Sequence, residues 1–219
     1  MAEVETATPF ELLKLVGGDA ALNYANTVPW DGNVPYNERL KSYERLLAWA
    51  VHAGQIDHAE QAALAAEAAR RPEAAAAVLA EAVALRGLIH RVFVALARER
   101  EPDHEDLAWL NGVIARTLAH ARLVRAGTAE TTPEEGPYVW SWEPGTQLDR
   151  PLWPVIRAAA ELMTSPRLAR VHECDGERCG WLFVDTSKGG RRRWCSMEDC
   201  GNRAKAKRHY QRHKDEHTG

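Results

Sequence analysis

The chain has 219 residues, of which 45% are hydrophobic, and a formal net charge of −3 at pH 7, which suits one or two globular domains. No stretch approaches the ~18 uncharged apolar residues of a membrane span, and the N-terminus lacks the basic and apolar segments of a signal peptide. We therefore expect a cytoplasmic protein that does not contact a membrane.

The charge is unevenly distributed along the chain. Residues 174–219 hold 11 Lys and Arg against 7 Asp and Glu, a balance of +4 within a chain whose net charge is negative. A basic end on an acidic chain is typical of a segment that faces nucleic acid, and a merely solvated basic tail is the alternative.

The first 120 residues show the signals of successive helices. Asp19, Ser42, Asp57 and Asp103 each stand where an N-cap residue would begin a helix. Glu60, three residues after Asp57, completes a capping box. We therefore predict a mainly α N-terminal domain.

A long helix is predicted to begin at Pro72 and to continue to about Arg100. Its apolar residues recur at steps of three and four, which predicts one buried seam, formed by Val78, Ala82, Leu85, Ile89, Val92 and Leu96. A core helix is the leading interpretation. A coiled coil that would make a homodimer is the alternative.

The pattern changes to strand-like segments after this helical region. The segments "ARLVRAG" and "PYVWSWE" predict a small β-hairpin near residues 121–143 that packs on the helices. Asp149 is then expected to cap a helix that has Pro151 in its first turn and ends near Pro166. The helical domain is thus predicted to span residues 1–165.

Polar residues in the segment "LNYANTVPW" suggest a candidate ligand pocket. Asn23, Asn26, Thr27 and Trp30 lie at helical spacing and could bind a small-molecule effector. The alternative is that the Asn and Thr side chains satisfy local backbone groups.

All four cysteines lie within one short C-terminal segment. Each pair encloses four residues, and fifteen residues separate the pairs, which are formed by Cys174, Cys179, Cys195 and Cys200. In a reducing compartment such a cluster favours a metal site over disulfides. Zn²⁺ with four tetrahedral thiolates at about 2.3 Å is the leading interpretation. Iron, redox disulfides, and replacement of one ligand by His172, His209 or His213 are the alternatives.

The fifteen-residue spacer is predicted to bring the two cysteine pairs together. It runs apolar from Trp181 to Val184, can turn at residues 187–190, and returns to Trp194, which predicts a hairpin. Trp181, Phe183 and Trp194 would then cover the metal site.

A basic helix is predicted after Cys200. Its first turn could direct backbone N–H groups at the sulfurs of Cys195 and Cys200. Helical spacing puts Ala206, His209, Tyr210 and His213 on the face toward the hairpin. The cationic surface predicted to contact DNA consists of Arg191, Arg192, Arg193, Arg203, Lys205, Lys207, Arg208, Gln211 and Arg212.

The C-terminal segment closely resembles the CGNR zinc finger, whose defining residues stand here as Cys200, Gly201, Asn202 and Arg203. Both cysteine spacings and the "RWCSM" run agree with that pattern. The resemblance implies that Zn²⁺ is bound by Cys174, Cys179, Cys195 and Cys200, in a treble-clef-like finger over residues 170–219. Asn202 is expected to cap the helix or to bond a cysteine sulfur or a loop carbonyl. Arg203 is expected to pair with Asp185 or Asp199, or to reach a phosphate.

Upstream, "GGDAALNYANT" and "LLAWAVHAGQI" resemble the start of the ABATE domain, a family described as stress-induced transcription regulators. The resemblance implies a DNA-binding transcription regulator whose helical domain senses a signal or dimerises. The alternative is a zinc-stabilised module that binds protein or RNA and has a helical domain that senses a small molecule. No enzyme is expected, because the common catalytic motifs are absent and a tetrathiolate site leaves no open position on the metal.

Overall fold

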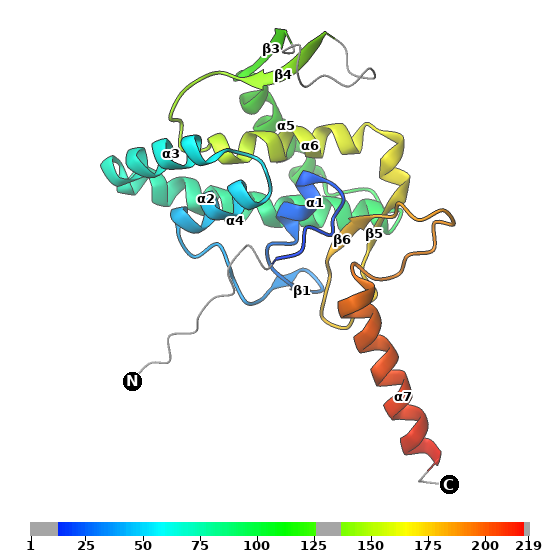
Figure 1. Ribbon diagram of the computed structural model, residues 1–219. Helices are drawn as coiled ribbons and strands as arrows, with labels where there is room; N and C mark the ends of the chain where they lie inside the picture. The colour runs from blue at the N-terminus through cyan, green and yellow to red at the C-terminus, as the bar shows by residue number, and fades with distance from the viewer. Residues whose placement is uncertain (1–12, 126–136, 217–219) are drawn as a thin grey trace, which may run out of the picture.

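The structure is a computed structural model that describes residues 13–125 and 137–216, with side chains described as far as residue 211 at the C-terminal end. The described part is mostly helical (Figure 1) and contains the α-helices α1 (Ala20–Ala25), α2 (Tyr43–His52), α3 (His58–Arg70), α4 (Pro72–Ala97), α5 (His104–Leu118), α6 (Trp153–Met163) and α7 (Asn202–Glu216). Its strands form antiparallel pairs, namely β1 (Trp30–Asp31) with β2 (Val34–Pro35), β3 (Ala121–Arg125) with β4 (Tyr138–Trp142), and β5 (Val171–Glu173) with β6 (Leu182–Val184).

The predicted helix starts are confirmed for α1, α2, α3 and α5. Asp19 accepts a hydrogen bond from the Ala21 N–H, and Ser42 and Asp103 cap their helices in the same way. Asp57 and Glu60 form the predicted capping box. These starts follow from the sequence because each cap bonds backbone groups within a few residues.

The expected cap at Asp149 is wrong. The Asp149 carboxylate accepts a hydrogen bond from the indole N–H of Trp153 at 3.0 Å, and it makes no cap bond. A 3₁₀ turn (η2, Arg150–Leu152) precedes α6 instead. A buried indole N–H needs an acceptor, and the nearby carboxylate supplies it.

Helix α4 runs through the centre of the helical body, by which we mean the described residues up to 165 (Figure 1). The predicted seam residues Ala82, Leu85, Ile89 and Val92 are buried in the core that α4 shares with α1, α2 and α6. The core interpretation of this helix is confirmed. The seam faces the protein's own interior and so is not free to form a coiled coil.

The predicted hairpin is confirmed as β3 and β4. Its strands pair from Ala121 opposite Trp142 to Arg125 opposite Tyr138, and the segment between them lies outside the described residues. Trp142 packs against Trp153 of α6, with ring centroids 5.7 Å apart. This contact fixes the base of the hairpin to the helical body.

The hairpin predicted within the cysteine spacer is wrong. Strand β6 pairs with β5, which precedes the first cysteine, so that Val171 lies opposite Val184. Leu182 and Val184 are buried in the helical core, and Phe183 is buried on the side of the cysteines. A strand buried on both faces needs a partner strand that also borders the core. The segment that begins at Val171 is apolar enough to do so, whereas the segment with arginines at 191–193 is not.

The C-terminal module, residues 170–216, is joined to the helical body by buried hydrogen bonds. The Asn26 side chain bonds both the N–H and the C=O of Leu182, at 2.9 and 2.8 Å. His90 of α4 donates to the carbonyl of Gly180 at 2.9 Å, and its ring stacks on Trp30 at 3.8 Å. Strands β5 and β6 therefore complete the core of the helical body.

Helix α7 projects away from the rest of the molecule (Figure 1). It follows a π-helical turn (η4, Met197–Gly201) that contains the last cysteine. Within the described residues, none of the helices combines the length and the apolar character that a membrane span requires.

Candidate metal centre and nucleic-acid interface

The fold brings all four cysteine sulfurs to one point. Their Sγ atoms lie within 4.8 Å of one another, and each cysteine is at most 7% exposed. Phe183 is buried beside them, with Val16, Trp181 and Trp194 packed around the cluster. The predicted aromatic cover is therefore in place.

The sulfur spacing fits a tetrahedral ion and not a disulfide. Cys179 Sγ and Cys200 Sγ each lie 3.7 Å from Cys195 Sγ. Four sulfurs at about 2.3 Å from a central zinc ion would be separated by about 3.8 Å, whereas a disulfide requires about 2.05 Å. The residues present thus fit a tetrathiolate metal site. Among the described residues, no histidine belongs to the cluster, and His172 lies against Phe183 instead.

Backbone N–H groups point at Cys174 rather than at the sulfurs predicted from the helix start. Gly176 and Cys195 donate to Cys174 Sγ at 3.4 and 3.2 Å. The neighbouring thiols of Cys179 and Cys195, together with these N–H groups, hold the pKa of the Cys174 thiol well below its usual range. A side chain at Gly176 would meet Cys200 Sγ at 2.8 Å, so this turn requires glycine.

The two polar residues of the CGNR motif have separate roles. Asn202 donates to the carbonyl of Glu198 at 3.0 Å, which is one of its expected contacts. Arg203 donates to Cys200 Sγ at 2.9 Å, and not to Asp185 or Asp199 as expected. This thiolate contact raises the pKa of the Arg203 guanidinium.

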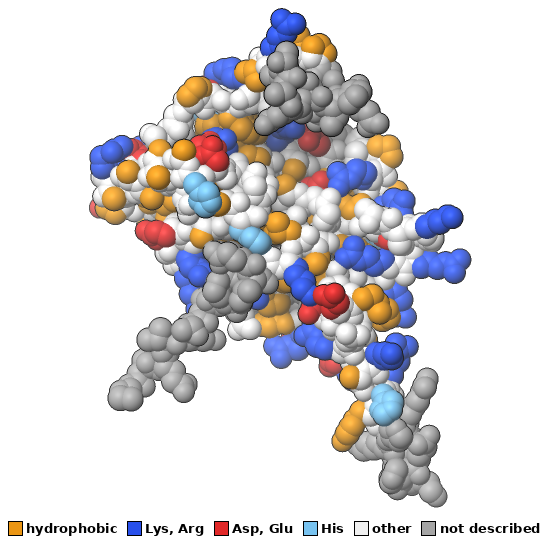
Figure 2. Space-filling view, viewed as in Figure 1, with side chains coloured by type: hydrophobic (Ala, Val, Ile, Leu, Met, Phe, Trp, Pro, Cys, Tyr) orange, Lys and Arg blue, Asp and Glu red, His pale blue; other side chains and the backbone are white. Residues whose placement is uncertain are grey.

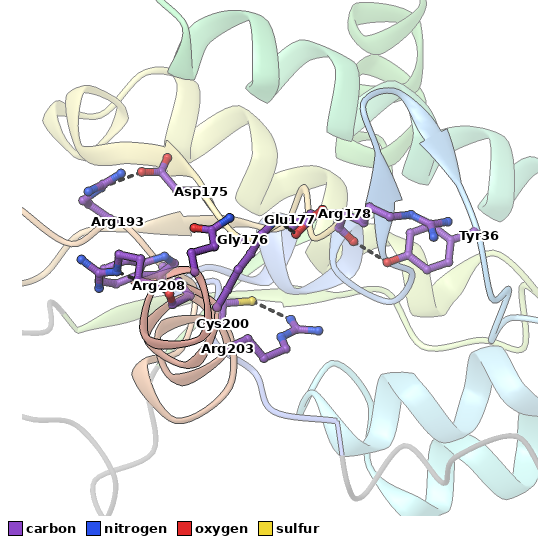
Figure 3. A pocket seen from close by; sticks show the side chains of 13 residues that line it. Tyr36, Asp175, Gly176, Glu177, Arg178, Arg193, Cys200, Arg203 and Arg208 are labelled. Carbon is purple, nitrogen blue, oxygen red and sulfur yellow. Dashed lines mark hydrogen bonds and ion pairs between the residues drawn. The ribbon is translucent and has the colours of Figure 1, made fainter. Parts of the chain in front are cut away.

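A groove of about 650 Å³ lies between the first cysteine turn, Asp175–Arg178, and the start of α7 (Figure 3). Outside α7, the cations that line it are Arg178 and Arg193. The α7 residues that line it are Arg203, Ala204, Lys207, Arg208 and Gln211. The groove is bordered by both cations and carboxylates.

The predicted orientation of α7 is wrong. Ala206, His209 and Tyr210 are exposed rather than packed on the hairpin, and Tyr210 is 72% exposed. The face toward the groove is the one that carries Arg203 and Lys207. The reason is local, because Arg203 bonds Cys200 and Lys207 pairs with Glu177 at 2.6 Å. The side chains of His213 and Arg212 lie outside the described part.

The structure divides the predicted cationic surface into paired and unpaired groups. Arg193 pairs with Asp175 at 2.7 Å, as Lys207 does with Glu177. In contrast, the exposed side chains of Arg191 and Lys205 contact no carboxylate among the described residues, and Arg208 bonds a carbonyl of its own helix. Figure 2 shows Lys and Arg side chains gathered over the C-terminal module and the first turns of α7.

Arg192 is half-buried and its guanidinium bonds groups of the module itself. Its guanidinium lies 4.3 Å from the Phe183 ring and donates to the carbonyls of Trp194, Cys195 and Val16. The guanidinium is therefore already engaged within the module, a placement that the predicted DNA contact did not include.

Sequence reasoning considered Asp185 only as a partner of Arg203 and missed that it orders the turn that carries Lys188 and Arg191. Its buried carboxylate accepts hydrogen bonds from the N–H groups of Ser187 and Arg192, at 2.8 and 3.0 Å. The Ser187 hydroxyl and these N–H groups lower the pKa of Asp185 to about 2. The Asp-Thr-Ser-Lys-Gly-Gly run is typical of an Asx turn and could have identified this residue. The exposed Lys188 of this turn and Arg178 of the groove were also missed.

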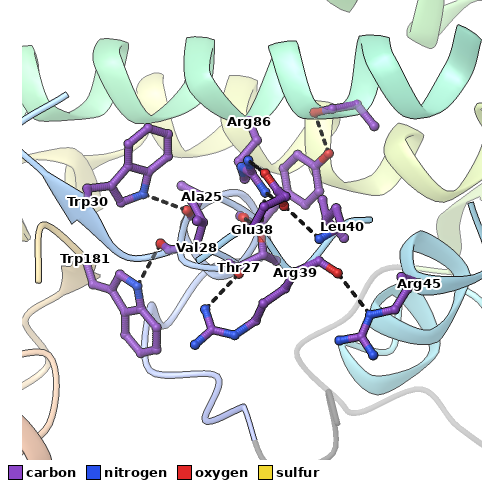
Figure 4. Close-up of polar contacts among 12 residues, drawn as sticks. Ala25, Thr27, Val28, Trp30, Glu38, Arg39, Leu40, Arg45, Arg86 and Trp181 are labelled. Carbon is purple, nitrogen blue, oxygen red and sulfur yellow. Dashed lines mark hydrogen bonds and ion pairs between the residues drawn. The ribbon is translucent and has the colours of Figure 1, made fainter. Parts of the chain in front are cut away.

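The candidate ligand pocket is not supported by the structure. Asn23 accepts from the Gly17 N–H, Asn26 bonds Leu182, and the Thr27 hydroxyl bonds the carbonyl of Tyr24. The Trp30 indole N–H donates to the carbonyl of Ala25 at 3.0 Å (Figure 4). These side chains satisfy backbone groups of the chain itself, which is the alternative stated from the sequence.

The fold and the site define a mainly helical protein with a C-terminal tetrathiolate metal-binding module. Two family models match the chain. The model described as "Putative stress-induced transcription regulator" (ABATE) matches residues 18–166, and the CGNR zinc finger matches residues 170–213. Since the first match covers more than half of the chain, the protein belongs to the ABATE family, and it carries a CGNR zinc finger. Neither description names an enzyme. A search of curated proteins found no significant match.

Proposed function

We propose that the protein is a transcription regulator that binds double-stranded DNA through α7 and the cationic turn of its zinc finger. The observation that carries this proposal is the exposure of α7 along its described length, together with its basic composition. A helix that is polar all round gains little from packing on its own domain, so it suits an external partner.

The dimensions of α7 support a place in the major groove. An α-helix with its side chains is about 10–12 Å wide, and the major groove is about 12 Å wide. Arg208 and Gln211 lie on the side of α7 that lines the finger's groove, and these residue types can bond base edges. Lys188 and Arg191 on the turn and Lys205 on α7 would contact phosphates, which position the protein without reading sequence.

A structural Zn²⁺ is part of this proposal. Cys174, Cys179, Cys195 and Cys200 would hold it, and four protein thiolates leave no open position for water. Its role would be to fix the cysteine turns and the start of α7. In this division residues 170–219 contact DNA, and residues 1–165 support the finger.

The test is a fluorescence-anisotropy titration of a DNA duplex between 50 and 300 mM salt. If Lys188, Arg191 and Lys205 contact phosphates, the logarithmic salt slope should be about −3. Arg191→Ala and Lys205→Ala should each reduce its magnitude by about 1. Arg125→Ala is the matched control, since this exposed cation lies on β3 at the far end of the molecule from α7. Salt-independent binding, or an equal loss with Arg125→Ala, would contradict the proposal.

A further inference from the structure

Arg203 differs from the other cations of the finger's groove in the partner it holds. Arg193 and Lys207 pair with the carboxylates of Asp175 and Glu177. Arg203 instead donates to the sulfur of Cys200 at 2.9 Å (Figure 3). Arg203 is thus a cation that bonds the sulfur of a predicted metal ligand, and it follows that ligand by three positions in the sequence.

Cys200 borders two cavities of the finger. It lines the groove of about 650 Å³ and also a second cavity of about 510 Å³, which Cys179 and Cys195 line as well, so Cys200 can be approached from two directions although it is only 2% exposed. Arg203 lines both cavities as well. Its guanidinium therefore borders the same two cavities as the Cys200 sulfur that it bonds.

A hydrogen bond from a charged donor changes the chemistry of a thiolate. Four thiolates and one Zn²⁺ carry a net charge of −2, which favours loss of a ligand to a proton or to an electrophile. A guanidinium N–H at the sulfur offsets this charge and draws electron density from the lone pair. Cys174 has a different arrangement, because backbone N–H groups of Gly176 and Cys195 donate to it.

We propose that Arg203 is a positioning residue of the metal centre, which keeps the Cys200 thiolate on the ion and shields it from electrophiles. The residue was predicted to contact nucleic acid, and the geometry gives it this role independently of any DNA. Removing the guanidinium should loosen one ligand and leave the other three in place.

The experiment compares Arg203→Gln with Lys207→Gln in the full-length protein, each loaded with one zinc per chain. Both changes remove one positive charge from the same helix face and the same groove, but Lys207 has a carboxylate partner. Zinc transfer to a chromogenic chelator should be about 10-fold or more faster for Arg203→Gln than for the wild type. Lys207→Gln should release zinc at the wild-type rate.

A second measurement locates the change at one sulfur. Iodoacetamide alkylates a thiolate by forming a carbon–sulfur bond as iodide leaves, and peptide mapping reads each cysteine separately. Arg203→Gln should speed the labelling of Cys200 selectively, and Arg203→Lys should restore part of the protection. Equal release rates for the two Gln variants, or equal labelling of all four cysteines in Arg203→Gln, would overturn the proposal, because the second result indicates general unfolding.

Discussion

Three consecutive arginines in the finger make three different sets of contacts. Arg191 extends into solvent, Arg192 packs on Phe183 and bonds backbone carbonyls, and Arg193 pairs with Asp175. Their common charge therefore gives no common role. The differences follow from the Asp185 carboxylate, which fixes the backbone at Arg192 and so determines the direction in which each side chain leaves the turn.

The contrast between Arg191 and Arg192 is testable by two single substitutions. Arg192→Ala should lower the free energy of unfolding by about 2 kcal/mol or more, because it leaves carbonyls near the metal centre without their charged donor. Arg191→Ala should leave stability within about 0.5 kcal/mol of the wild type while weakening DNA binding. Urea unfolding of the zinc-loaded protein measures the first effect. Equal stability of the two variants would contradict the structural role of Arg192.

His90 should make stability depend on pH. Its ring is fully buried, and its Nε2–H donates to the carbonyl of Gly180 while Nδ1 has no partner among the described residues. Burial lowers the pKa of His90 to about 4, and the positive charges of Arg98, Arg91 and Arg86 contribute to this lowering. The unfolded chain has a His pKa of about 6.5, so it binds more protons than the folded chain between pH 6.5 and pH 4. Stability should therefore fall as pH falls through this window.

The contribution of His90 to the pH dependence of stability has an upper limit and can be measured with a variant that does not titrate. Across the whole window the loss attributable to His90 would approach about 3 kcal/mol. His90→Gln keeps an N–H donor but cannot titrate, so its stability should change less between pH 7.5 and 5.5 than that of the wild type. Urea unfolding at both pH values, with zinc content confirmed at each, gives the comparison. Parallel pH profiles would show that His90 does not carry the effect.

At the scale of secondary-structure elements, local signals predicted more than contacts between distant segments did. Caps at Asp19, Ser42 and Asp57 involve neighbouring backbone groups, and the seam of α4 repeats within one helix, so both could be predicted from the sequence. The partner of β6 could not, because a strand with two buried faces pairs with whichever segment borders the same core. The choice of β5 as the partner of β6 depends on the shape of the helical body, and the spacer sequence alone contains no information about that shape.

The four cysteines were predictable for a related reason, and the orientation of α7 was not. The spacing of the ligands in the sequence restricts a metal site to a few geometries, so two closely spaced pairs of cysteines predict that their four sulfurs cluster. The face of α7 was predicted from hydrophobicity, but a very polar helix has too weak an apolar face to determine its packing. Two specific contacts, from Arg203 to Cys200 and from Lys207 to Glu177, determine it instead.

At the scale of the whole molecule, the finger and the helical body share one hydrophobic core. Val171, Leu182 and Val184 of the finger are buried in the same cluster as Leu22 of α1 and Ile89 of α4. The Asn26 side chain, which bonds the backbone of Leu182, extends this junction. Loss of the finger strands would thus expose the helical core as well as abolish the metal site.

This shared core predicts how truncated chains behave. Burial of Val171, Leu182 and Val184 contributes about 1.5–3 kcal/mol each, a sum comparable with the whole stability of a typical domain. A chain ending at Ser165 should therefore lack a cooperative thermal transition by far-ultraviolet circular dichroism. A chain ending at Ala204 is the matched control, since it loses most of α7 but keeps all four cysteines, Arg203 and both finger strands. It should retain zinc and melt cooperatively while losing affinity for DNA. A well-folded chain ending at Ser165 would show instead that the helical body completes its core without the finger.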